Sequence, residues 1–296
     1  MDDLMGGAAG CLQPGMEVGD FTVMEFLGSG AHGESYLAVG ASGTEDTVVR
    51  LLSPQRNPAD RMTGRIADLM EKGRDIRNLH VLEYLDGQSD EFFNWVAFRR
   101  SDWVPLSRVI RERKSRGEGG FSEKEVRRMI FQVLLALCVL HKRGIVHGAL
   151  KPAHCFIDEQ FCLEVADSGL SPLLGSPAHF GSPEAGLDVV DIPGFTPRAG
   201  AVIESALFAA PECSMGADYS VESDLYSVGF LAWHLFTGYL RADANFFYDL
   251  EEEIQESWGS WFLRATEPLP GNRFHSAEDM LAHLPGVEVV DEEKES

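Results

Sequence analysis

Residues 144–157, which read G-I-V-H-G-A-L-K-P-A-H-C-F-I, constrain the fold more than any other part of the chain. Pro152 ends a helix that enters from residues 135–142, because proline lacks the amide hydrogen and clashes with the preceding turn. The apolar residues 155–157 that follow are typical of a buried strand. Catalytic side chains commonly lie on a polar loop held between such elements. We therefore expect a functional site to be built around this loop.

Within this stretch, residues 147–154 resemble the catalytic loop of eukaryotic-type (Hanks-type) protein kinases, whose pattern is H-R-D-L-K-P-x-N. Four residues match the frame of that pattern: His147, Leu150, Lys151 and Pro152. The three positions that carry chemistry differ. Gly148 stands in place of the Arg, Ala149 in place of the base Asp, and His154 in place of the metal-binding Asn.

A glycine-rich word follows the strand-like run at residues 21–27. Gly28, Gly30 and Gly33 form G-x-G-x-x-G, which is weak evidence alone. A dinucleotide-binding fold requires a helix next. Residues 34–39 and 47–52 are instead short runs of strand formers, which predict a hairpin. Glycines in such a hairpin let backbone amides approach a phosphate. The surrounding letters, L-G-S-G-A-H-G-E-S-Y-L-A, resemble kinase loops of bacterial type.

Three residues of the predicted small lobe depart from the kinase pattern. Ser35 replaces the Val that covers the adenine, Val48 replaces a small Ala, and Arg50 replaces the phosphate-binding Lys. Arg50 is still a cation, but its planar fork does not substitute freely for a point charge. Residues 58–79 predict a helix. The resemblance implies that it is the regulatory helix of the small lobe, whose acidic residue pairs with the strand lysine in active kinases. Its Glu71 or Asp68 is a candidate partner of Arg50, and the alternative is that both are solvated surface acids.

The small lobe is expected to end in strands at residues 81–84 and 92–98. Phe98 then falls near the gatekeeper position, and residues 99–103 form the hinge between lobes. Ser122 with Glu125 predicts a capping box at the start of the next helix. The long segment 170–206, rich in Gly and Pro, is expected to be partly mobile.

Further kinase-like words follow in the family's order. Residues 165–169 resemble the D-F-G word, with Asp167 as the retained metal-binding residue and Ser168 in place of Phe. The resemblance implies structural roles for four residues. His147 faces the core, Asp224 accepts hydrogen bonds from the catalytic-loop backbone, and Glu212 of the A-P-E word forms a buried salt bridge with Arg273.

These words together predict an α+β, two-lobed protein-kinase-like fold. The expected division is a flexible leader (1–15), a β-rich N-lobe (16–100), a helical C-lobe (101–285) and an acidic tail or linker (286–296). The charged end suggests one domain of a longer protein. The N-terminus lacks a basic segment followed by an apolar one, so no secretory signal is predicted.

Composition limits the partners and the compartment. The chain has 25 Lys+Arg against 47 Asp+Glu, a formal charge of -22, which argues against nucleic acid and anionic membranes. The chain lacks an apolar run near the roughly 20 residues needed to span a bilayer. Five cysteines without metal-ligand spacing indicate reduced thiols and a cytoplasmic setting. A protein partner is expected.

The altered residues favour a pseudokinase that acts as a protein-binding or allosteric module. Ala149 cannot accept a proton, and imidazole is a poor ligand for Mg²⁺, which prefers hard oxygens. The expected nucleotide contacts are Gly28, Gly30, Gly33, Arg50, Val48, Phe98 and Phe156. Because Val48 and Phe156 are larger than the family's residues and face each other across the adenine slot, close packing argues against tight ATP binding. No cofactor is expected to be required, with ATP and Mg²⁺ the candidate ligands.

Two alternatives stay open. One is a kinase-fold enzyme with atypical nucleotide-dependent transfer through Asp167, and the other is a weakly active Ser/Thr kinase that uses Lys151. A zinc site at His147, His154 and Cys155 is disfavoured, because the spacing fits no usual ligand pattern.

Overall fold

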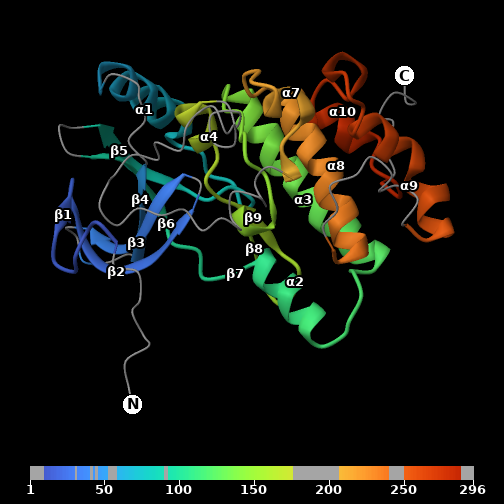
Figure 1. Ribbon diagram of the computed structural model, residues 1–296, viewed down its shortest axis with the longest axis horizontal. Coiled ribbons are helices and arrows are strands. Elements are labelled where there is room, and N and C mark those ends of the chain that lie inside the picture. Colours follow the sequence, from blue (N-terminus) through green and yellow to red (C-terminus); the bar gives the residue numbers. More distant parts are fainter. Residues whose placement is uncertain are drawn as a thin grey trace, which may run out of the picture.

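The computed structural model describes residues 10–30, 32–40, 43, 46–52, 59–89, 93–175, 207–239 and 250–287. It has two lobes, with strands gathered in the N-terminal part and helices in the C-terminal part (Figure 1). The predicted α+β, two-lobed architecture is confirmed. In the described residues no helix has the length and apolar character needed to cross a membrane. All five cysteines are free.

The N-lobe is built on a six-stranded antiparallel sheet in the order β1-β2-β3-β4-β6-β5. Its strands are β1 (Glu17–Val18), β2 (Phe21–Gly30), β3 (Gly33–Gly40), β4 (Asp46–Leu52), β5 (Tyr84–Ser89) and β6 (Asn94–Arg99). The hairpin predicted around the glycines is β2–β3. One face of the sheet packs a small core of its own around Val23, Tyr36, Val49 and Trp95.

The end of the predicted leader belongs to this lobe. Leu12 is buried in the small core, and its amide donates a hydrogen bond to Tyr36 Oη at 3.1 Å. The Cys11 amide donates to Glu34 Oε2 at 2.9 Å. Residues 10–13 are therefore packed, in contrast to the flexible leader predicted for residues 1–15. Residues 1–9 lie outside the described part of the chain.

Helix α1 (Ala59–Gly73) packs on the sheet beside β5. It ends earlier than the predicted residue 79. A Cβ at Gly73 would lie 2.8 Å from Tyr84 Cγ, and Asp75 adopts a left-handed φ of 64°, so the chain turns there. The strand predicted at residues 81–84 is also wrong. Val81 forms only an isolated parallel bridge with Val165, and β5 begins at Tyr84.

The C-lobe is mainly helical. Its described helices are α2 (Leu106–Ser115), α3 (Glu123–Lys142), α4 (Leu170–Leu174), α7 (Pro211–Ser214), α8 (Val221–Thr237), α9 (Glu252–Ala265) and α10 (Ala277–Ala282). The predicted capping box starts α3: the Ser122 amide donates to Glu125 Oε2 at 2.8 Å, and the Glu125 amide bonds back to Ser122 Oγ. This cap satisfies amides that lack a partner within the helix.

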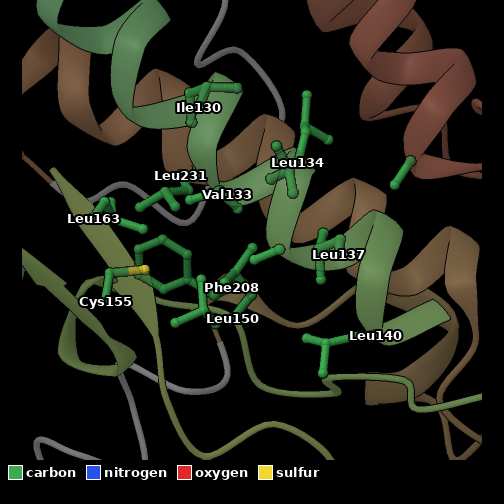
Figure 2. Close-up of a cluster of buried hydrophobic side chains, with 14 of the residues drawn as sticks. Ile130, Val133, Leu134, Leu137, Leu140, Leu150, Cys155, Leu163, Phe208 and Leu231 are labelled. Carbon is green, nitrogen blue, oxygen red and sulfur yellow. The ribbon is translucent and has the colours of Figure 1, made fainter. Parts of the chain in front are cut away.

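The centre of the C-lobe core is shown in Figure 2. Leucine, isoleucine and valine side chains along one face of α3 meet Cys155 of β8 (Cys155–Ile157), Leu163 of β9 (Leu163–Val165) and Leu231 of α8. Each fully buried aliphatic side chain of this kind contributes about 1.5–3 kcal/mol. The core thereby fixes the end of α3 and the β8–β9 hairpin, which are the two supports of the loop between them.

Candidate functional site

One buried carboxylate, that of Asp224, holds the loop between α3 and β8 in place. Asp224, in the first turn of α8, is 1% exposed. Its Oδ2 accepts a hydrogen bond from the His147 amide at 2.7 Å, and its Oδ1 accepts one from the Gly148 amide at 2.8 Å. His141 Nε2 lies 2.9 Å from Oδ2. These are the backbone hydrogen bonds expected of Asp224, and they give the loop a kinase-like course.

A second buried ion pair anchors the A-P-E word on α7, where the activation segment of the resembled family ends. Both oxygens of Glu212 on α7 bind the guanidinium of Arg273, at 2.7 and 2.8 Å. Arg273 is 1% exposed and also donates to the backbone oxygens of Glu267, Pro268 and Glu222. A buried guanidinium needs this number of acceptors to offset its desolvation. The expected salt bridge is present.

The loop offers no carboxylate at the position of the catalytic base. Ala149 supplies only a methyl group, and its amide donates to His147 Nδ1 at 3.2 Å. His147 is fully buried, as expected, and burial lowers its pKa. Lys151 is also buried and lies just before the short 3-10 turn η1 (Pro152–His154). The loop therefore keeps its lysine and lacks a carboxylate at the base position.

Arg50 on β4 forms a two-pronged salt bridge with Asp167. Nε lies 2.8 Å from Oδ1 and Nη2 lies 2.7 Å from Oδ2, while Nη1 bonds to Ser35 Oγ. The α1 acids that were candidate partners of Arg50 do not reach it. Asp68 pairs instead with Lys72 at 2.6 Å, and Glu71 is exposed. The prediction that an α1 acid pairs with Arg50 is therefore wrong, and the alternative of solvated surface acids holds.

Helix α4, which directly follows the Asp167 word, contacts α1. Arg65 of α1 donates to the Leu173 carbonyl at 3.1 Å, so α1 rests on α4. A Cβ at Gly169 would lie 2.6 Å from Leu69 Cδ1 of α1. Ser168, at the position of the family's Phe, has a buried Oγ without a partner in the described residues, and its carbonyl accepts from Tyr84 Oη at 2.8 Å.

The same helix fills the space beside Gly148. This glycine has a left-handed φ of 74°, and a Cβ there would lie 2.6 Å from Pro172 Cδ. The family's Arg at this position would meet both the strained backbone and the proline. Residues 176–206, the remainder of the segment predicted to be partly mobile, lie outside the described part of the chain.

Two histidines meet Asp167 at the phosphate end of the cleft. His32, on the turn between β2 and β3, has its Nε2 2.6 Å from Ser171 Oγ and its ring centroid 5.2 Å from that of His154. His154 Nε2 lies 3.5 Å from Asp167 Oδ2. Burial lowers the pKa of His32 to about 3 and the pKa of His154 well below its ordinary value, so both imidazoles are neutral at pH 7.

The expected nucleotide contacts share one cleft of about 480 Å³ between the lobes. Its walls include Gly28, Gly30, Gly33, Arg50, Val48, Phe98 and Phe156. Val48 pairs with Phe98 across neighbouring strands, and Phe156 lies on β8. The volume falls in the range of about 300–1,000 Å³ usual for small-molecule pockets. Val48 and Phe156 thus line the cleft, and its volume alone does not exclude a nucleotide.

The residues at the metal positions do not fit Mg²⁺. Mg²⁺ requires octahedral oxygen ligands. Asp167 supplies oxygens, but Arg50 engages both of them, and His154 offers nitrogen at the second position. The lysine, base and metal positions of the resembled family are thus all altered within one cleft.

Sequence reasoning missed His32 and the contact between Arg50 and Asp167. His32 lies in the glycine-rich word, and its contacts with Ser171 and His154 show that the loop reaches the C-lobe. The Arg50–Asp167 pair spans 117 residues along the chain. The available signal was the arginine itself, because its long side chain can reach a carboxylate on a distant segment of the chain.

Comparison with known proteins gives consistent matches. The family model described as "Protein kinase domain" matches residues 21–260. The chain is 26% identical over 253 residues to the carbon catabolite-derepressing protein kinase of Candida albicans, covering 81% of this chain and 35% of that protein. It is 26% identical over 249 residues to serine/threonine-protein kinase ULK3 of Xenopus laevis, covering 83% and 48%.

Among the solved structures that match are kinase domains from Mycobacterium tuberculosis. The PknI kinase domain of Mycobacterium tuberculosis superposes with a TM-score of 0.67 at 22% identity, covering 91% of this chain and 96% of that one. At this identity the likeness establishes the fold. The chain spans about a third of the length of the first curated relatives it matches.

Proposed function

The chain belongs to the protein kinase domain family, and from that premise we propose that it is a pseudokinase domain. Its frame holds a kinase-like surface that binds a protein partner or transmits an allosteric signal. Asp224, Glu212 and Arg273 maintain that frame through buried hydrogen bonds. Phosphoryl transfer is impaired because Arg50 and Asp167, the charged groups expected to bind phosphate and metal, form a salt bridge with each other.

The observation that carries the proposal is the Arg50–Asp167 salt bridge. In active members of the family, the strand lysine aligns phosphates and the aspartate holds a metal ion. Here the guanidinium occupies both oxygens of Asp167 at 2.7–2.8 Å. A metal ion at Asp167 must share these oxygens with a charge-assisted, two-pronged contact, which is the strong class of hydrogen bond, and must lie beside the guanidinium charge.

The base position gives independent support. A positioned general base contributes about 10²- to 10⁴-fold to a rate, and Ala149 cannot supply it. The loss adds to the altered metal site because both act on the same transition state. We expect phosphoryl transfer to be near the background of the assay.

Nucleotide binding is expected to be weak for an electrostatic reason. Val48, Phe98 and Phe156 line the part of the cleft expected to take the adenine, whereas the part expected to take the phosphates holds the Arg50–Asp167 pair and the ring of His32. Phosphates entering there must break the pair or move the ring. ATP is therefore expected to bind mainly through its adenosine, and Mg²⁺ is expected to add little to its affinity.

The test is a pair of assays on the intact chain. Transfer of labelled γ-phosphate to itself and to generic protein substrates should match that of Asp167→Ala. Thermal-shift titrations with ATP should give the same shift with and without Mg²⁺ or Mn²⁺. Transfer that Asp167→Ala abolishes, or strongly metal-dependent stabilisation by ATP, would overturn the proposal.

A second candidate is a weakly active Ser/Thr kinase. It is favoured by the open cleft and by the retained Lys151, and the matched curated relatives are described as Ser/Thr kinases. The combined variant Arg50→Lys, Ala149→Asp and His154→Asn decides between the two. A large gain in transfer would favour a cleft that is otherwise competent. If transfer does not increase, other features of the cleft, such as the packing of α4 against Gly148, also prevent it.

A further inference from the structure

His32, His154 and Asp167 form a cluster with the composition of a transition-metal site. They come from three separate segments: the β2–β3 turn, the end of η1 and the second residue after β9. One potential ligand atom from each residue lies within 4.8 Å of those of the other two. Asp167 and His154 are buried. Two imidazoles and one carboxylate are a common ligand set for zinc in proteins.

The tautomer of His154 points its lone pair into the cluster. Its Nδ1 lies 2.8 Å from the Ala149 carbonyl oxygen, which can only accept a hydrogen bond. Nδ1 therefore carries the proton, and Nε2 presents a lone pair 3.5 Å from Asp167 Oδ2. Metal-bound histidines characteristically donate their other ring N–H to a backbone carbonyl or carboxylate in this way. The loop geometry thus prepares Nε2 as a ligand.

The separations match the size of a zinc-class ion. Ligand atoms about 2.0–2.1 Å from a tetrahedral Zn²⁺ lie roughly 3.3 Å from one another. The 3.5 Å separation of His154 Nε2 and Asp167 Oδ2 already fits. The ligand atoms of the three residues all lie within 4.8 Å of one another, so closing them around one ion requires their separations to shorten by at most about 1.5 Å.

The ligand atoms, and not the neighbouring charges, determine which cation can enter. Arg50 is bonded to Asp167, and Lys151 lies close enough to affect the pKa of both histidines, so positive charge opposes every dication. For a hard cation such as Mg²⁺, only Asp167 of the three residues offers oxygen. Nitrogen ligands shift the preference to the borderline-soft metals that imidazole suits. A carboxylate oxygen has two lone pairs, so Oδ2 can accept from Arg50 and bind a metal together.

We propose that His32, His154 and Asp167 bind a divalent transition metal of the zinc class, which ties the glycine-rich turn of the N-lobe to the C-lobe. The ion cross-links β2–β3 to the loop and to the start of the activation segment. The cleft closes at its phosphate end, and the relative position of the lobes becomes dependent on the metal. This inference goes beyond the proposed function and does not depend on whether the domain transfers phosphate.

The test is direct binding by the chelator-treated intact chain, without nucleotide. Calorimetric titration with ZnCl₂ should give one saturable site per chain, and thermal unfolding should show a saturable rise in Tm that MgCl₂ does not produce. Hydrogen exchange of residues 21–40 should slow when Zn²⁺ is added. Because no nucleotide or kinase substrate is present, failure here leaves the pseudokinase proposal untouched, and the reverse also holds.

Three variants assign the site. His32→Gln and His154→Gln each remove one ligand and should weaken Zn²⁺ binding about tenfold or more. His275→Gln, at an exposed histidine on the C-lobe, should bind as the wild type does. His32→Gln keeps the buried loop intact, so the test survives if His154→Gln fails to fold. Absence of saturable binding by the wild type would overturn the proposal. Wild-type affinity in His32→Gln would also overturn it and would indicate adventitious binding to surface acids.

Discussion

Arg50 shows how one side chain changes what a cleft can do. Its side chain is 23% exposed and that of Asp167 is 4% exposed, so the carboxylate is the more deeply buried partner. Removing the guanidinium leaves a nearly buried charge without its counter-ion. Such a loss costs several kcal/mol in a dry interior and less where solvent reaches one partner.

We therefore expect Arg50→Met to lower the free energy of unfolding by about 2 kcal/mol. Arg50→Lys should lower it less, because lysine keeps the charge but makes a single contact. Urea denaturation of the three proteins at pH 7 measures both effects. If Arg50→Met is as stable as the wild type, the pair does not hold the cleft.

Asp224 supports a second prediction at this scale. Asp224→Ala removes the acceptor of two loop amides, those of His147 and Gly148, and leaves His141 without its partner. We expect a loss of about 3 kcal/mol or more, since each unsatisfied buried group costs about 1–3 kcal/mol. Asp224→Asn, which keeps one acceptor oxygen, should lose clearly less. Equal losses in denaturant unfolding would show that packing, and not hydrogen bonding, dominates.

Among the elements, α4 has the largest influence on the site. It lies against α1 through Arg65 and Leu173, and against the loop through Pro172 and Gly148. One five-residue helix therefore contacts both α1 and the loop between α3 and β8.

Gly148→Ala tests the contact between the loop and α4. The variant adds a Cβ at a left-handed φ of 74° and 2.6 Å from Pro172 Cδ. The matched control is Gly117→Ala, where φ is 72° and a Cβ meets nothing within 4 Å. Backbone strain of about 1–3 kcal/mol is common to both. Gly148→Ala should be destabilised further by the clash, and Pro172→Ala should relieve that excess. Equal losses in the two alanine variants would remove the packing role of α4.

The elements also show what sequence reasoning can reach. The hairpin β2–β3, the cap of α3, and the Asp224 and Glu212–Arg273 contacts follow from local pattern or from words kept in the family's order. The partner of Arg50 does not, because it depends on where α4 places α1. The early end of α1 at Gly73 depends on the ring of Tyr84, which lies in strand β5. Local patterns do not encode such contacts between distant segments.

For the whole molecule, buried histidines link stability to pH. Burial lowers the pKa of His147 and His234 below 6.5, although Asp224 and Asp167 partly oppose this for His147 and the Tyr239 carbonyl opposes it for His234. Lys114 lowers the pKa of His234 further. Above pH 6.5 both residues are neutral in the folded and unfolded chains. Below pH 6.5 the unfolded chain binds protons that the folded chain does not, so acid favours unfolding.

We expect the free energy of unfolding to fall between pH 7.5 and pH 5.5 by up to about 1.4 kcal/mol for each of these histidines, or about 3 kcal/mol for the two. Urea denaturation with a metal chelator present measures the slope. His234→Gln should remove the contribution of His234, up to about 1.4 kcal/mol, while the other buried histidines, His32 and His154 among them, retain theirs. A free energy of unfolding that does not change with pH, or that rises in acid, would contradict the assignment.

The contact of Gly148 with Pro172 has a consequence for any attempt to evolve phosphoryl transfer in this scaffold. An arginine introduced at position 148 would clash with Pro172 unless α4 shifts. A library that aims at the family's arginine there should therefore diversify residues 170–174 before position 148, so the order of the substitutions would matter as well as their number.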